Sequence, residues 1–437
     1  MPQEVVSRSS KKLFLTDINC IPKGFLLSIH GNKLNKLIIF VFKISELEFL
    51  QYTHNALLEG TSNTLFRQLS QSIDWSQQLI CIKGFRGVGK TTLLLDYIKS
   101  EFGADKSILY LNLNNFYFTK RKIFSFADEF SKLGGKVLFL DQINKYPDWS
   151  AELRKCHDEI PDLKIVFTAS PVLRVSDGNP DLQGIVKIYH LEGLSFREYL
   201  NYKTGEHFRM YSLGEILLDH VAISQKIVEK VKPLAYFSEY LKNGYYPYFM
   251  EHPSFYPMTL LKNINLALEV DVPYINQIEL KYLSKLRKLL QIIASETPFS
   301  PNVSKLATAV ETSRATVMNY LHYLKNARLI QLLYSNGGED QMKKPDRVYL
   351  HNTNLQYAIA PDNINNINLR QTFFYNQVGY QHNLKSVQGA DFLVDDRYEF
   401  VVGGRKLDPP AGRYAASDMI EVGEGNKIPL WLFGFLY

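Results

Sequence analysis

The sequence of 437 residues predicts an α/β fold organised on a doubly wound parallel sheet. Short apolar runs typical of buried strands alternate with helical patterns along residues 79–170. A glycine-rich segment, GFRGVGKTT at 84–92, lies between the first of these strands and the first helix. A later apolar run at 137–140 ends directly in Asp141. Because parallel strands need long crossover connections, usually helices, this alternation predicts a parallel sheet with helices on both faces.

The glycine-rich segment has the spacing of a P-loop, in which Gly84 is followed after four residues by Gly89, Lys90 and Thr91. Glycines let the backbone approach a phosphate closely, and the amides and the helix N-terminus present positive partial charge to it. Lys90 can reach the terminal phosphates, and the Thr91 hydroxyl can ligate Mg²⁺. The alternative is a glycine-rich turn without a ligand. The candidate nucleotide-binding residues are Gly84, Gly87, Val88, Gly89, Lys90, Thr91 and Thr92.

Polar residues end two later strands of the predicted sheet. Asp141 closes the apolar run LFLD, the Walker B arrangement, in which the carboxylate orders the water shell of Mg²⁺ opposite the P-loop. Thr91 and Asp141 are therefore the candidate metal residues, and a helix cap is the alternative for Asp141. Thr168 and Ser170 end the strand at 163–170 and are candidate sensors of the γ-phosphate. Their alternative role is to satisfy a turn.

Charge, cysteines and hydropathy limit the other classes of function. The net charge is +6, but residues 1–43 hold seven Lys/Arg against two acids, so a global nucleic-acid argument is weak. The three cysteines show no metal or disulfide spacing, which suits a reducing cytoplasm. No apolar run approaches the ~20 residues of a membrane span. We expect a cytoplasmic protein without membrane insertion, with a poorly ordered basic extension at 1–44.

The second half of the chain contains a helix–turn–helix pattern. Apolar helical patterns at 205–275 predict a lid or connector, and residues 281–350 have the order of a winged helix, with a wing loop at 335–340. The window 281–350 holds eleven Lys/Arg against five acids. A DNA reader would place base contacts at the start of the second helix. The candidate DNA contacts are Ser313, Arg314 and Thr316. The alternative is an interdomain coupling module with solvated basic residues.

The order of these motifs resembles one family, the AAA-type ATPases with a P-loop domain, a winged helix and a C-terminal restriction-endonuclease-like domain of unknown function. The resemblance covers roughly residues 45–437. It rests on GFRGVGKTT, LFLDQINKYPDW, IVFTAS, LEGLSFREYL, YLKNGYYPYF, SPNVSKLA, KPDRVYLHNTNL, TFFYNQ, DFLV, VVGGRK and NKIPLWLFGFLY.

The resemblance implies a domain order along the chain. After the extension at 1–44 we expect a P-loop AAA-type domain with a helical lid at 45–275. A winged helix at 276–360 and an endonuclease-like α/β domain at 361–437 follow.

The chain departs from the family pattern at ionisable positions. Gln142 stands where AAA-type ATPases commonly have a Glu that polarises the attacking water; an amide can orient water but cannot accept its proton. Gly184 and Ile185 replace a pair of arginines, and such an arginine is worth ~10³–10⁵ in rate. Gln371 stands where Glu is typical, and Val401 where the family phrase reads Phe-Glu-Val-Gly-Gly. This pattern indicates a member that binds nucleotide but is catalytically impaired.

The C-terminal region also lacks ionisable residues that its expected chemistry would need. The pattern places Asp391 at the start of one strand and Lys406 near the end of the next. A nuclease of this fold needs a carboxylate pair plus a lysine to hold metal and activate water. Without acidic partners at 371 and 401, Asp391 predicts an inactive, structural domain.

Two functions from different classes follow. The first is an ATP- and Mg²⁺-binding AAA-type protein that acts as a nucleotide-dependent switch on a protein partner, with weak or impaired hydrolysis. The second is a DNA-binding winged-helix module gated by ATP. The sequence does not identify the partner or the oligomeric state.

Overall fold

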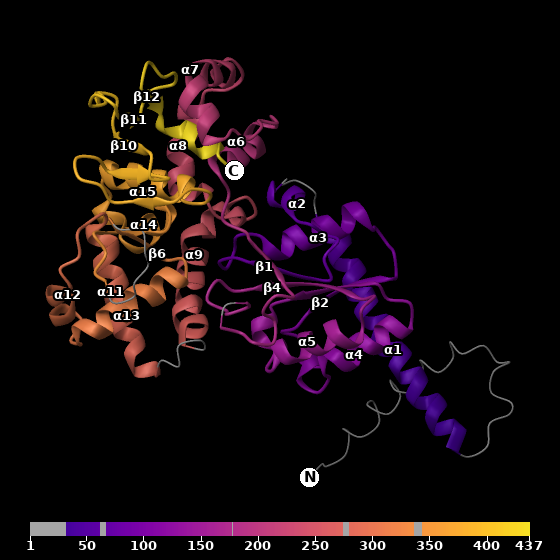
Figure 1. Ribbon diagram of the computed structural model, residues 1–437. Coiled ribbons are helices and arrows are strands. Elements are labelled where there is room, and N and C mark those ends of the chain that lie inside the picture. Colours follow the sequence, from indigo (N-terminus) through magenta and orange to yellow (C-terminus); the bar gives the residue numbers. More distant parts are fainter. Residues whose placement is uncertain (1–31, 62–66, 177, 274–278, 336–342) are drawn as a thin grey trace, which may run out of the picture. The chain divides into compact units, whose positions relative to one another are not determined.

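The computed structural model describes residues 32–61, 67–176, 178–273, 279–335 and 343–437 (Figure 1). Residues 1–31 of the predicted extension and residues 336–340 of the predicted wing loop lie outside the described residues. Residues 1–56 and 57–437 form two separate units, and every element after α1 belongs to the second. Helix α1, Asn32–Gly60, begins before the boundary expected at residue 45. It contains neither proline nor glycine before its last residue, so nothing in its sequence interrupts the helix.

A five-stranded parallel sheet carries the P-loop. Its strands are β1 (Leu79–Lys83), β2 (Ile108–Asn112), β3 (Val137–Asp141), β4 (Lys164–Ala169) and β5 (Lys187–His190). The strand order is β2-β3-β4-β1-β5, and all four pairings are parallel. The predicted parallel α/β sheet is therefore confirmed. Because β4 lies between β1 and β3, residues at its carboxyl end lie between the P-loop and Asp141.

Helices cover both faces of this sheet, as a doubly wound fold requires. Helix α3 (Lys90–Glu101) lies on one face, and α4 (Ile123–Lys132) and α5 (Trp149–Glu159) lie on the other (Figure 1). Strands β1 to β4 are buried along most of their length, which explains their uninterrupted apolar sequences. The short helix α2 (Leu69–Ser72) precedes β1.

Three helices follow the sheet and contact the C-terminal segment of the chain. They are α6 (Phe196–Thr204), α7 (Leu213–Lys230) and α8 (Pro233–Glu239), and all contact the 3₁₀ segment Leu430–Phe435. The amide of Tyr211 donates to the carbonyl of Phe435 at 3.0 Å. Helices expected in the lid therefore also bury the C-terminal segment.

Residues 256–359 contain helices and one hairpin. The helices are α9 (Tyr256–Leu266), α11 (Leu283–Glu296), α12 (Val303–Ala309), α13 (Arg314–Asn326) and α14 (Thr353–Ile359). Strands β6 (Ile330–Leu333) and β7 (Arg347–Leu350) pair antiparallel, and Phe299 forms a further antiparallel bridge with Val348. Helices α11, α12 and α13 and strands β6 and β7 lie within residues 281–350, for which we expect a winged helix, and that assignment stays a prediction.

A second sheet occupies the C-terminal region. Its strands are β8 (Leu384–Lys385), β9 (Phe392–Val394), β10 (Tyr398–Gly403), β11 (Tyr414–Ser417) and β12 (Lys427–Pro429). The order is β12-β11-β10-β9-β8, parallel from β10 to β12 and antiparallel from β8 to β10. Helix α15 (Asn366–Val378) packs against β10 and the final 3₁₀ segment.

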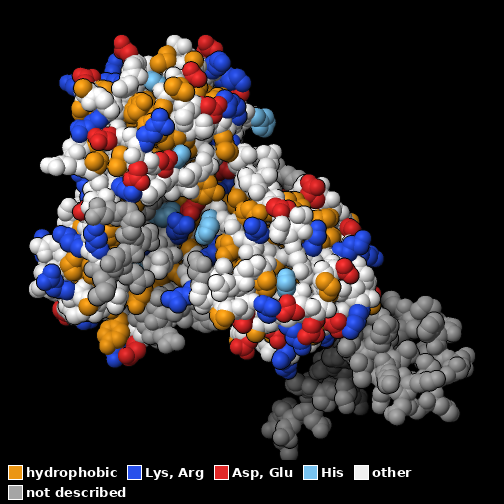
Figure 2. Space-filling view, viewed as in Figure 1, with side chains coloured by type: hydrophobic (Ala, Val, Ile, Leu, Met, Phe, Trp, Pro, Cys, Tyr) orange, Lys and Arg blue, Asp and Glu red, His pale blue; other side chains and the backbone are white. Residues whose placement is uncertain are grey.

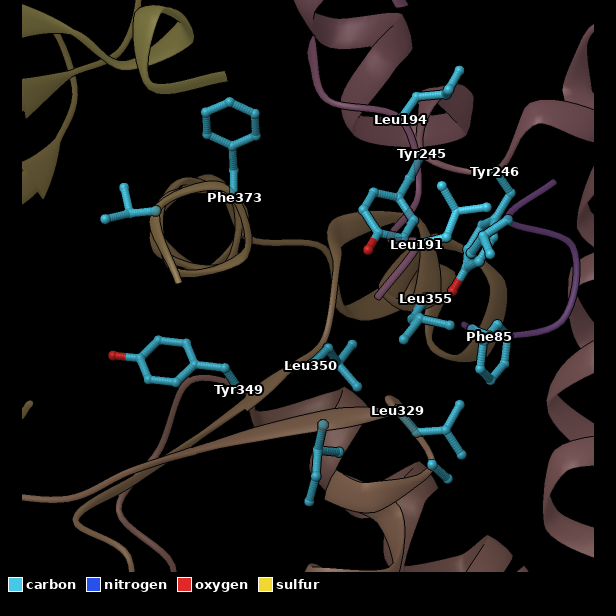
Figure 3. Packing of buried hydrophobic residues seen from close by; sticks show 14 of the residues in the cluster. Phe85, Leu191, Leu194, Tyr245, Tyr246, Leu329, Tyr349, Leu350, Leu355 and Phe373 are labelled. Carbon is cyan, nitrogen blue, oxygen red and sulfur yellow. The ribbon is translucent and has the colours of Figure 1, made fainter. Parts of the chain in front are cut away.

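A continuous apolar core joins the P-loop to the second half of the chain. Phe85 of the P-loop contacts Tyr246, with ring centroids 5.7 Å apart. Tyr245, Tyr246 and Leu355 lie beside Leu191 in the same cluster (Figure 3). Tyr245 and Tyr246 are both buried, so they pack within this core.

Candidate functional site

The P-loop connects β1 to α3 in the conformation that its glycines allow. The Gly84 amide donates to the Ala169 carbonyl at 3.2 Å, which joins the start of the loop to the end of β4. Gly87 and Gly89 have φ of 83° and 96°, in the left-handed region that favours glycine. Val88 between them is buried, and α3 begins at Lys90. The loop therefore directs its backbone amides and a helix N-terminus to one point.

Lys90 is held inside the loop. Its Nζ donates to the carbonyl oxygens of Gly84 and Phe85 at 2.7 and 2.9 Å. Burial lowers the pKa of Lys90 to about 8, although the negative charge of Asp141 acts in the opposite direction. A phosphate would add negative charge beside this amine and favour its protonated form.

Asp141 is the centre of a hydrogen-bonded cluster. Its Oδ2 accepts from Thr91 Oγ1 at 2.6 Å and from the Tyr110 hydroxyl at 2.7 Å. Thr168 Oγ1 donates to Oδ1. The structure thus brings together three predicted site residues, Thr91, Asp141 and Thr168. A threonine hydroxyl beside one carboxylate fits Mg²⁺, which keeps several waters and takes its other ligands from phosphates.

Gln142 follows this carboxylate in a left-handed conformation, with φ of 61°. Its backbone nitrogen lies 3.0 Å from Asp141 Oδ1 and 2.9 Å from Thr168 Oγ1. The buried Thr168 hydroxyl therefore links the ends of β3 and β4. Ser170 is buried beyond β4 and its carbonyl accepts from the Leu173 amide, whereas Thr92 is exposed on α3.

Tyr110 is a site residue that the sequence analysis missed. Its partner strand places Asn112 opposite Asp141, and Tyr110 lies two residues earlier on the same face of β2. Burial is the main cause of the raised pKa of Tyr110, and the negative charge of Asp141 raises it further. The alternation in ILYLN would have identified it, had the pairing of β2 with β3 been known.

Two contacts connect the P-loop to the helical region before α11. Arg86 Nε and Nη2 donate to Asp271 Oδ2 and Oδ1 at 2.8 and 2.6 Å. A Cβ atom added at Gly87 would lie 2.5 Å from the Tyr248 ring. The loop needs glycine here for its φ and because an aromatic ring packs against it.

Arg67 also holds the P-loop in place. Its Nη1 donates to the Val88 carbonyl and its Nη2 to the Glu192 carbonyl, both at 2.7 Å. Its Nε lies 3.3 Å from Glu198 Oε1. Glu198 also forms a capping box with Ser195 at the start of α6. The segment LEGLSFREYL thus anchors an arginine that holds the P-loop.

The three candidate DNA contacts lie on a different element, at the start of α13. Ser313 Oγ accepts from the Thr316 amide at 3.0 Å and lies 2.8 Å from Thr316 Oγ1. The Ser313 hydroxyl therefore caps the helix, and the Thr316 hydroxyl contacts that cap. Arg314 is exposed.

Asp391 is fully engaged in structural contacts. It accepts from Gln371 Nε2 and the Val402 amide, both at 2.8 Å, and from Arg347 Nη1 at 3.2 Å. The nearby acidic residue Glu399 forms an ion pair with Arg413 and does not contact Asp391 in these bonds. In the described part of the chain, no three His, Cys, Asp or Glu side chains come together in a way that could hold a metal ion.

The fold and this site define a P-loop domain, and comparison with known families specifies its type. Residues 76–200 match the AAA domain family. The chain therefore contains an AAA-type P-loop ATPase domain. Residues 234–363 match a domain of unknown function.

One curated relative is an uncharacterized protein of Methanocaldococcus jannaschii, 25% identical over 284 residues. The alignment covers 61% of this chain and 58% of the relative, so it spans less than two thirds of that protein. Within the described residues, none of the helices combines the length and hydrophobicity that crossing a bilayer requires.

Two solved structures are similar at low identity. The Walker-type ATPase PABY2304 of Pyrococcus abyssi is 12% identical, with 68% of this chain and 95% of that chain covered and a TM-score of 0.41. DnaA of Aquifex aeolicus bound to AMPPCP is 14% identical, with 59% and 84% covered and a TM-score of 0.25. Both TM-scores are below 0.5, so these similarities say nothing about the activity of this chain.

Proposed function

We propose that this protein binds ATP with Mg²⁺ through Gly84–Thr92 and Asp141 and acts as a nucleotide-dependent switch that hydrolyses ATP slowly. The observation that carries the proposal is the Thr91–Asp141 pair at 2.6 Å beside a P-loop whose Lys90 is in place, followed by an amide at Gln142. Buried Cys81 and Cys156 are free thiols, which suits a reducing cytoplasm.

Slow hydrolysis follows from what the site lacks chemically. Gln142 can orient a water molecule but cannot take its proton at neutral pH. Gly184 is exposed with φ of 81°, and neither it nor Ile185 can supply a positive charge to the transferring phosphoryl group. Binding depends on groups that are present, whereas efficient cleavage depends on the three replaced positions, Gln142, Gly184 and Ile185.

The switch needs a route from the phosphates to the rest of the chain. Arg86 and Gly87 are both inside the P-loop, and they contact Asp271 and Tyr248 of the following helical region. Phosphate binding redirects the loop amides and can therefore change these two contacts. The α11–α13 region follows directly after Asp271 in sequence.

Hydrogen exchange tests the switch. ATP with Mg²⁺ should alter amide protection in residues 240–272, and the Lys90→Ala variant should show no change under the same conditions. Thr308→Ala, on exposed α12 surface, is a matched control that should respond like the parent protein. Identical exchange with and without ATP in a protein that binds ATP would contradict the switch.

A second candidate function is DNA binding by residues 276–360, which we interpret as a winged helix. It is favoured by exposed Arg314 at the N-terminus of α13 and by the β6–β7 hairpin. Arg314→Ala should then reduce salt-dependent DNA binding, while Lys288→Ala on exposed α11 should not. Absence of binding at low salt would rule it out.

We interpret the C-terminal region as an inactive endonuclease-like domain. Asp391 is held by an amide side chain, a backbone amide and an arginine, so its oxygens are already used. We expect no metal-dependent DNA cleavage. Cleavage that disappears in Asp391→Ala would overturn this interpretation.

A further inference from the structure

A cleft of about 700 Å³ has walls from three main parts of the chain, and Ile188, His190, Glu192 and His351 complete its lining. The first part is Lys83 with the loop 171–176, which follow β1 and β4. The second runs from the end of α13 into β6, and the third from the end of α15 into β8. Figure 2 shows Lys, Arg and His side chains around a hollow near the middle of the face in view.

The lining of this cleft is predominantly basic. Five Lys or Arg side chains line it against one carboxylate, Glu192. Glu192 is itself engaged by Arg328 at 3.3 Å and lies 3.7 Å from His351 Nε2. Lys385 pairs with Asp396 just outside the lining. Lys83, Arg174 and Lys325 also contribute positive charge to the lining.

A histidine of the lining lies close to these cations. His190 is exposed at the cleft, and its pKa is lowered by partial burial and then by the positive charges of Arg328 and Lys83. The positive charges of Arg328 and Lys83 also attract an anion.

Aromatic side chains are interleaved with the cations. Tyr375 and Tyr380 line the cleft, and their hydroxyls donate to the carbonyls of Leu332 at 3.0 Å and His190 at 3.2 Å. These hydrogen bonds hold the rings in place on the wall. Cations that follow a backbone together with fixed aromatic rings are the combination that single-stranded nucleic acids require.

We propose that this cleft binds the phosphodiester backbone of a single-stranded nucleic acid. Walls from three parts of the chain enclose it, which admits one strand more readily than a duplex. This site is separate from the α13 surface at Arg314 and from the P-loop, and it goes beyond the proposed ATP-dependent switch.

The cleft shares two strands with the nucleotide site. Lys83 directly precedes Gly84, and its Nζ donates at 2.8 Å to the carbonyl of Leu173 in the loop after β4. That loop begins directly after the strand that carries Thr168. Occupation of either site can therefore move the backbone of the other.

Fluorescence anisotropy of a labelled oligothymidine longer than ~16 nucleotides, the upper site size of one binding fold, tests the proposal on the full chain. The double variant R174Q/K325Q should weaken binding about tenfold or more and reduce the salt slope by about 1.4, since each lost contact to a single strand removes about 0.7. Arg405→Gln, exposed after β10 and outside the cleft, is the matched control and should bind like the parent protein. Arg174→Gln alone serves if the double variant does not fold, because the Arg174 side chain is exposed.

Three results would overturn the proposal. One is no oligothymidine binding at low salt. Another is binding that R174Q/K325Q leaves unchanged and that Arg314→Ala abolishes, which would place the nucleic acid on α13. The third is displacement of the oligothymidine by an equal concentration of inorganic pyrophosphate, which would show a site for a small phosphorylated ligand.

Discussion

Arg86 of the P-loop and Asp271 of the helical region before α11 form a two-pronged ion pair, with N–O distances of 2.8 and 2.6 Å. The Asp271 side chain is only 3% exposed, whereas that of Arg86 is 23% exposed. Residues 185 positions apart in sequence are thus joined at the loop that receives phosphate. This pair is the most direct physical link between the nucleotide site and the second half of the chain.

Removing either partner should destabilise the protein, but unequally. Arg86→Ala leaves a buried carboxylate without its cation, at a cost on the order of 3–5 kcal/mol. Asp271→Ala leaves a guanidinium that can reach water, so the loss should be smaller. Urea denaturation measures both midpoints. A larger loss for Asp271→Ala would contradict this reading of the pair.

ATP affinity should fall as the pH rises above about 8. Burial lowers the pKa of Lys90 to about 8, and phosphate charge should raise it again in the complex. The complex then holds more protons than the separate partners, so binding weakens with rising pH, by up to about tenfold per pH unit. Calorimetry in buffers of different ionisation enthalpy should show proton uptake near pH 8.5 and little near pH 7. Equal affinities and no uptake would contradict the role of Lys90.

The Thr168 hydroxyl should matter more than its shape. Thr168→Val keeps the volume but removes the donor to Asp141 and the acceptor for the Gln142 backbone amide. For buried groups this should lower the free energy of unfolding by about 1–3 kcal/mol. Thr168→Ser retains the hydroxyl and should lose less. Denaturation midpoints and Mg²⁺-dependent ATP affinity measure the two variants. If Val and Ser behave alike, the hydroxyl does not organise the site.

Gln142→Glu should raise ATP turnover. A carboxylate at this position can accept a proton from the attacking water, and general-base catalysis contributes about 10²–10⁴-fold. We expect a rise near the lower limit, because Gly184 and Ile185 still supply no positive charge. Steady-state phosphate release measures this, with Gln142→Ala as the control that should stay at or below the parent rate. An unchanged rate in Gln142→Glu would show that the amide is not what limits turnover.

The parallel sheet and the core of the site were predictable because their signals are local. GFRGVGKTT and the apolar run ending in Asp141 each lie on one strand–turn segment, so spacing alone identifies Lys90, Thr91 and Asp141. Strand order is not local: only the position of β4 between β1 and β3 brings Thr168 to Asp141. The sequence therefore suggested Thr168 without its partner.

The contacts that hold the P-loop could not be predicted in this way. Arg67 belongs to no motif, and Arg86 stands at a variable position of the P-loop pattern. Tyr248 lies in the stretch YLKNGYYPYF, which does not reveal its contact with Gly87. The partners of all three are distant in sequence. Asp271 ends a π-helical segment, and its role depends on tertiary packing.

The most direct test measures ATP binding and ATP turnover in one preparation of the full chain. We predict saturable Mg²⁺-dependent ATP binding that Lys90→Ala abolishes, with turnover at or below about 10⁻² s⁻¹, the range of nucleotide hydrolases that lack external activation. Turnover of 1 s⁻¹ or faster, on the order of ordinary enzymes and abolished by Lys90→Ala, would contradict the account.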